Sequence, residues 1–162
     1  MPAYFDMSLQ FRREDLYPSF MADFDAHLER AGLGFRSGFW EDKGLSQAEI
    51  AAWNQKKLNE DFVLGMKTHR SHDYKQTLYR FGDYEEVRGF WMNQHPEKGV
   101  FTYFIIIPES EVLECNLTFR VDAAAELLEL AKGLWQFPSV RAIQTGLEGD
   151  GPTLSLAELR QG

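Results

Sequence analysis

The run from Val100 to Ile107, Val-Phe-Thr-Tyr-Phe-Ile-Ile-Ile, is the most informative part of the chain for the expected architecture. Successive residues of a strand point to opposite faces, and in the second half of this run large apolar residues occupy both faces. A strand of this kind must be covered on both faces. We therefore expect a central strand, which Pro108 ends. Two shorter strand-like runs over residues 74–81 and 85–93 precede it, and the turn residues between the three runs predict an antiparallel meander.

Helical periodicity and end signals predict the elements on either side of this meander. Gly32 follows an apolar stripe with helical spacing and is a typical helix terminator, and Asp122 is a favourable N-cap residue. Ser46 and Glu49 have the spacing of a capping box, which predicts that a helix begins at Gln47. The elements expected outside the meander are strands over 4–11, 34–41, 112–119 and 140–147 and helices over 15–31, 47–59 and 123–135.

These elements predict an α+β fold, in which a mostly antiparallel sheet of about five to six strands carries two to three packed helices. The chain of 162 residues is expected to form a single globular domain over residues 1–162, with a short C-terminal tail from about residue 152. A chain of this length buries enough apolar surface to fold without a disulfide or a structural metal.

Cysteine usage and hydropathy predict a cytoplasmic protein. The single cysteine, Cys115, cannot form an internal disulfide, and its place in an alternating apolar run indicates an inert buried residue. The first ten residues lack the basic and apolar regions of a secretory signal, and no run of about 18 apolar residues could cross a bilayer. A membrane is therefore not an expected partner.

Negative charge gathers in the second half of the chain. The formal net charge is −8 at pH 7, and residues 82–162 hold 13 acidic against six basic residues, whereas residues 1–81 hold 12 against 11. This balance disfavours nucleic acid as a partner and favours a basic protein. If the acidic turns share one end of the sheet, they form a docking surface with Tyr84, Trp91 and Tyr103 as aromatic anchors. Ordinary solubilising surface charge is the alternative for any single cluster. The expected partner-binding residues are Asp83, Glu85, Glu86, Trp91, Glu109, Glu111, Glu114, Glu148 and Asp150.

The sequence contains no recognisable catalytic or cofactor motif, so a non-enzymatic protein without a cofactor is expected. The serines lie outside the known nucleophile motifs, and the glycine-rich loop over 146–151 contains acidic residues and no lysine, which disfavours a phosphate ligand. His69, His72 and Asp73 are close enough in sequence to bind a metal, but partner ligands from a second segment are lacking. A metal site there is a minor alternative to an exposed loop.

The expected function is that of an acidic binding protein for a basic partner protein. One concrete form is an immunity or antitoxin-type inhibitor, which presents carboxylates where a cationic toxin would bind phosphates. The alternative is a small-molecule-binding domain or enzyme with an aromatic-lined pocket. The residues expected to line that pocket are Trp40, Tyr79, Trp91 and Phe104, with His72, Asp73 or Arg88 as polar groups.

Overall fold

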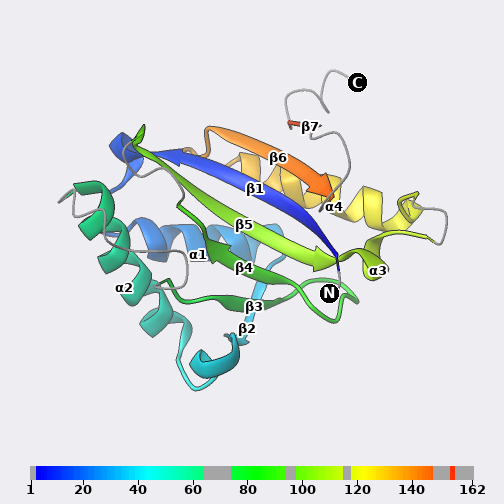
Figure 1. Ribbon diagram of the computed structural model, residues 1–162, viewed down its shortest axis with the longest axis horizontal. Coiled ribbons are helices and arrows are strands. Elements are labelled where there is room, and N and C mark those ends of the chain that lie inside the picture. Colours follow the sequence, from blue (N-terminus) through cyan, green and yellow to red (C-terminus); the bar gives the residue numbers. More distant parts are fainter. Residues whose placement is uncertain (1–2, 64–73, 94–97, 115–117, 148–153, 156–162) are drawn as a thin grey trace.

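The computed structural model describes residues 3–63, 74–93, 98–114, 118–147 and 154–155, and an antiparallel sheet in the order β2-β3-β4-β5-β1-β6-β7 forms its centre (Figure 1). The strands are β1 (Tyr4–Arg12), β2 (Gly34–Gly38), β3 (Thr77–Arg80), β4 (Arg88–Trp91), β5 (Val100–Pro108), β6 (Ala142–Leu147) and the two-residue β7 (Leu154–Ser155). The helices are α1 (Phe20–Ala31), α2 (Gln47–Leu58), α3 (Glu109–Val112) and α4 (Val121–Trp135), with short helical turns η1 (Arg13–Asp15), η2 (Trp40–Asp42) and η3 (Asn59–Val63). The predicted α+β fold is confirmed.

β5 lies in the middle of the sheet, as its two apolar faces predict. Ile105, Ile106 and Ile107 are all buried, whereas the first half of the strand alternates between buried and half-buried residues. Its neighbours are β4 and the N-terminal strand β1, which pairs with β5 along its whole length. β1 also pairs with β6, so this strand holds the two halves of the sheet together.

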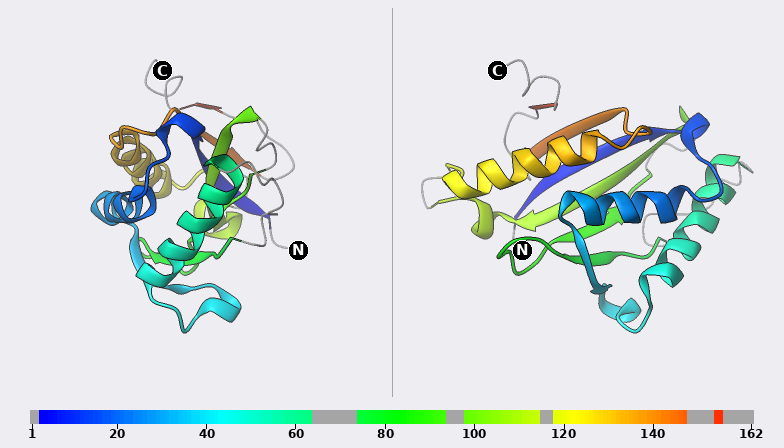
Figure 2. Two further views of the ribbon diagram at one scale, coloured as in Figure 1. Left: turned by 90° about the vertical axis from the view of Figure 1, so that its left-hand side faces the viewer. Right: turned by 180° about the vertical axis from the view of Figure 1, so that it is seen from behind.

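The helices α1 and α4 lie on the same face of the sheet, and Figure 2 shows them in front of the strands in its right-hand view. Phe20, Phe24 and Leu28 of α1 are fully buried, as the helical spacing predicts. Phe11 of β1 is at the centre of the aromatic core, with ring-centroid distances of 5.2 to 5.6 Å to four other rings. These rings belong to Phe20, Phe24, Trp91 and Phe101. Among the described residues, no helix has the length and hydrophobicity of a membrane span.

The predicted capping box begins α2. The Ser46 hydroxyl accepts a hydrogen bond from the Glu49 amide at 3.1 Å, and the Glu49 carboxylate accepts one from the Ser46 amide at 2.9 Å. α2 is joined to α1 through Gln55, whose side-chain oxygen accepts from the Met21 amide at 2.8 Å. The predicted bounds of this helix are correct to within one residue.

The predicted strand over residues 112–119 is wrong. The described part of this segment contains the end of the short helix α3 and an isolated bridge between Leu113 and Phe119, and Cys115 lies outside the described residues. β5 has β4 on one side and β1 on the other, so no position beside it is left for residues 112–119. Long-range pairing with the N-terminal strand therefore overrides the local alternation.

Several element boundaries also differ from the prediction. α1 begins at Phe20 instead of Asp15, because the turn η1 and Pro18 precede the helix. β2 ends at Gly38, and Phe39 and Trp40 do not continue the strand. Trp40 is 74% exposed and has a φ of +52°. α4 has Arg120 as its N-cap residue, so Asp122 lies inside the first turn and does not cap the helix.

Gly89 of β4 allows two tyrosines to meet across the core. The hydroxyls of Tyr79 and Tyr103 share a short hydrogen bond, and a Cβ atom on Gly89 would overlap with the Tyr103 hydroxyl and the Tyr79 ring. We predict that Gly89→Ala lowers the free energy of unfolding by about 2–3 kcal/mol, because overpacking displaces both rings. Urea denaturation measures this change. Gly44→Ala is the matched control, since nothing lies within 4 Å of its Cβ position, and an equal loss there would contradict the argument.

Asp25 of α1 predicts a pH-dependent stability. Burial raises the pKa of its carboxyl to about 7, well above the ordinary value of 3.8. The folded state therefore holds a proton that the unfolded state releases, and stability falls as the pH rises from about 4 through 7. We predict that Asp25→Asn raises the free energy of unfolding at pH 8 by about 1–2 kcal/mol, after allowance for solvent screening, and has less effect at pH 5.

Urea denaturation at pH 5 and pH 8 measures the difference between the two proteins. Glu29→Gln, at an exposed position of the same helix, is the control and should leave the pH dependence unchanged. A parallel loss of stability with pH in wild type and Asp25→Asn would show that another group is responsible.

Candidate partner-binding site

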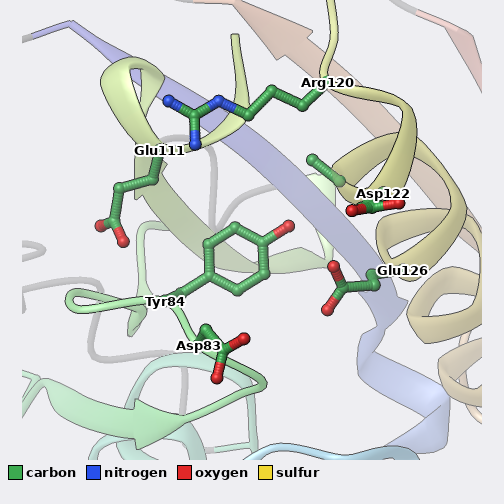
Figure 3. A pocket seen from close by; sticks show the side chains of 7 residues that line it. Asp83, Tyr84, Glu111, Arg120, Asp122 and Glu126 are labelled. Carbon is green, nitrogen blue, oxygen red and sulfur yellow. The ribbon is translucent and has the colours of Figure 1, made fainter.

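An acid-rich cleft lies where the β3–β4 turn, α3 and the first turns of α4 meet (Figure 3). Its volume is about 230 Å³. We call it the acidic cleft, and its lining consists of Asp83, Tyr84, Glu111, Arg120, Asp122, Ala123 and Glu126. Four carboxylates and one guanidinium give this lining a formal net charge of −3.

The start of α4 supplies two of the four carboxylates. Asp122 and Glu126 are four residues apart and so lie on the same side of the helix, one turn from each other. Both are exposed, and Figure 3 shows their side chains beside the ring of Tyr84. The positive end of the helix dipole favours the carboxylate of Asp122, which lies in the first turn of α4. α4 therefore provides an acidic wall for the cleft.

Gly82 lets the β3–β4 turn approach this wall closely. Its φ is +51°, in the left-handed region that favours glycine. A Cβ atom at this position would lie 2.8 Å from a carboxylate oxygen of Glu126. The left-handed backbone is thus the main reason for glycine here, since the exposed Glu126 side chain could move away from a Cβ atom.

Glu111 fastens α3 to the loop that carries Tyr84. Its carboxylate accepts hydrogen bonds from the backbone amides of Glu85 at 2.6 Å and Glu86 at 3.1 Å. Hydrogen bonds to a charged acceptor are stronger than those between neutral groups. Glu111 therefore both closes one side of the cleft and fixes the loop beside it.

The ring of Tyr84 lies between Glu111 and the two carboxylates of α4, and its hydroxyl forms no hydrogen bond within the described residues. The oxygen is buried and has no hydrogen-bond partner among the described residues. Burial raises the pKa of Tyr84 to about 12, and the charges of Glu126 and Glu111 add to this effect. The hydroxyl is therefore protonated at neutral pH and can donate a hydrogen bond to an acceptor.

The cations near the cleft leave most of its negative charge uncompensated. Arg120 donates to the carbonyl of Ser110 at 3.2 Å, and Arg36 donates to the carbonyl of Glu85 at 3.1 Å, so both of these hydrogen bonds go to the backbone. No basic side chain of the described ranges lies within ion-pair distance of Asp83, Asp122 or Glu126. Lys75, from the basic segment before β3, instead pairs with Asp42 at 3.0 Å.

The structure brings part of the predicted acidic set together. Asp83 and Glu111 line the cleft, and the backbone amides of Glu85 and Glu86 bind Glu111 beside it. Glu109 and Glu114 flank Glu111 in sequence without lining the cleft. Glu148 and Asp150 lie outside the described residues.

The aromatic residues predicted to serve as anchors are mostly in the core. Trp91 is 0% exposed and Tyr103 is 3% exposed, because β4 and β5 direct these positions toward the helices, so the expectation that Trp91 contacts a partner is corrected. Tyr84 alone of the three reaches the cleft.

The aromatic residues expected to line the alternative pocket differ widely in burial, and Phe104 is half-buried and stacks on Phe90 with ring centroids 5.7 Å apart. Tyr79 and Trp91 are buried in the core, whereas Trp40 is 74% exposed. The guanidinium of Arg88 stacks on the ring of Phe39 at 4.4 Å. The candidate metal ligands His69, His72 and Asp73 lie outside the described residues, and within the described part of the chain no group of three His, Cys, Asp or Glu side chains is arranged to hold a metal ion.

Sequence reasoning misses Asp122 and Glu126, although a signal for them is present. With Glu129 they recur at steps of four and three, which places all three on one face of α4, away from its buried apolar stripe. The prediction that Asp122 caps the helix rests on its residue type alone. It leaves out the helical spacing that relates Asp122 to Glu126 and Glu129.

Comparisons of the chain with protein-family models, with curated proteins and with solved structures found no match.

The role of Glu111 predicts a local loss of stability. Glu111→Ala removes the acceptor for two amides, and we expect the free energy of unfolding to fall by about 1–2 kcal/mol. Hydrogen exchange at the amides of Glu85 and Glu86 should accelerate in the same variant. Glu114→Ala removes an equal charge from an exposed neighbouring position and is the matched control. Unchanged exchange at both amides in Glu111→Ala would contradict this role.

Proposed function

We propose that this protein is a non-enzymatic binding protein whose acidic cleft docks on a basic partner protein. The observation that carries the proposal is the convergence of Asp83, Asp122 and Glu126 around Tyr84 without a described ion-pair partner. Carboxylates arranged in this way accelerate encounter with a cationic surface and disfavour anionic competitors.

An inhibitor of an enzyme that attacks nucleic acid is the form of the proposal that this chemistry suits best. Such an enzyme needs a cationic site for phosphate groups. A protein that places several carboxylates in that site blocks it by occupation and requires no bond to be made or broken. We therefore propose an immunity or antitoxin-type inhibitor, with the acidic cleft as the part that faces the enzyme.

Removal of charge from the cleft tests this proposal. Wild-type protein immobilised on a resin is expected to retain a basic protein from a lysate of the source cell at low salt, and retention should weaken at moderate salt. In Asp83→Asn/Glu126→Gln, the association rate constant with the identified partner should fall by about fivefold, and its salt dependence should become shallower. Surface plasmon resonance at several salt concentrations measures both quantities.

Glu14→Gln/Glu41→Gln is the matched control, because it removes the same charge from exposed positions that do not line the cleft. An equal fall in rate for both double variants would mean that net charge alone steers association. A partner that binds both variants and wild type alike would contradict the proposal. For the inhibitor form, wild-type protein should abolish hydrolysis of nucleic acid by the partner, and full hydrolysis in the complex would exclude that form.

A further inference from the structure

The acidic cleft continues into a second depression along α4. This depression has a volume of about 440 Å³, and we call it the apolar trough. It is lined by Ala31, Gly32, Phe81, Gly82, Ala125 and Leu130, with Glu126 and Glu129 as its charged residues. Glu126 lines both depressions, and Gly82 of the trough directly precedes Asp83 of the cleft. The two therefore form one continuous surface.

An aromatic wall runs through both parts of this surface. The ring of Phe81 in the trough stacks on the ring of Tyr84 in the cleft, with centroids 5.5 Å apart and an interplanar angle of 6°. Ala31, Gly32 and Ala125 line the trough together with Phe81 and have no side-chain atoms beyond Cβ, so the trough stays open. Its lining is thus mostly apolar, with the two carboxylates of Glu126 and Glu129.

We propose that the basic partner presents an amphipathic segment, which places an arginine or lysine in the acidic cleft and an adjacent apolar side chain on the apolar trough. This inference rests on the proposed function and adds the kind of segment that the site would accept. Two observations favour such a segment over a simple cation. The apolar trough offers contact area that a charge alone would not use. Glu126 and Glu129 of α4 supply carboxylates for basic side chains beside it, and Glu129 also pairs with Lys132 at 3.3 Å.

The Tyr84 hydroxyl gives a third reason to expect a peptide segment. It is buried and lacks a hydrogen-bond partner among the described residues, and as a donor it needs an acceptor. A basic side chain offers only donors, whereas the backbone of a bound segment offers carbonyl oxygens beside its side chains. One bound segment could therefore satisfy the carboxylates and the trough together, and it would reach the hydroxyl by displacing the atoms that cover it.

Two labelled synthetic peptides, which stand in for the partner's segment, test this inference. Both have seven residues and the same number of arginines, with leucine at the intervening positions of one and serine at those of the other. Fluorescence anisotropy at low salt measures their affinities. The leucine peptide should bind wild type about fivefold more tightly, because its apolar side chains leave water on the trough.

Ala125→Gln fills the trough without a change in charge and should reduce the affinity of the leucine peptide to that of the serine peptide. Ala124→Gln, at the adjacent exposed position that lines neither depression, is the matched control and should keep the fivefold difference. Equal affinities of the two peptides for wild type, or a difference that survives in Ala125→Gln, would overturn the inference.

The charge variant separates this inference from the proposed function. If both peptides bind Asp83→Asn/Glu126→Gln more weakly than wild type while leucine gives no advantage, the acidic cleft keeps its proposed function and the apolar trough loses its role. If neither affinity responds to Asp83→Asn/Glu126→Gln, the cleft is not the binding site, and the proposed function falls together with the inference.

Discussion

Burial of one face of the sheet beneath α1 and α4 is the constraint on which the rest of the structure depends. Alternate residues of β1, β4 and β5 must face the same aromatic core, which fixes strand register and makes Gly89 necessary where Tyr79 and Tyr103 meet. The same constraint decides the outer surface. Once the apolar stripe of α4 is held against the sheet, the acidic stripe of Asp122 and Glu126 is left on the side that meets the β3–β4 turn.

The sequence predicts the elements whose signals are local. The paired apolar faces of β5 identify the central strand, and the spacing of Ser46 and Glu49 locates the start of α2, because in both cases neighbouring residues determine the conformation. The prediction of a strand over residues 112–119 is wrong for the opposite reason. Their alternation satisfies a strand pattern, but the place beside β5 is taken by a strand from the other end of the chain, and no local pattern reveals this.

The acidic cleft is predictable in kind and only partly in its residues. Asp83 and Glu111 can be identified because acidic residues gather beside the predicted strands of the meander, and the fold places both of them in the lining of the cleft. The prediction that Trp91 contacts a partner is wrong, because an aromatic residue in an alternating strand can face either side of the sheet. Which side is buried depends on where the helices pack. Asp122 and Glu126 can be identified from the sequence only when helical periodicity is examined among charged residues as well as apolar ones.

The position of β1 has a consequence for how the protein reaches its folded state. β1 is synthesised before the other strands of the sheet, yet both of its neighbours, β5 and β6, come from much later in the chain. Phe5, Met7, Leu9 and Phe11 therefore remain unpaired while roughly ninety further residues are made, and closure of the sheet must follow translation of most of these elements. A chain that stops before Val100 would contain a hydrophobic strand with no partner, which makes premature termination a direct route to aggregation.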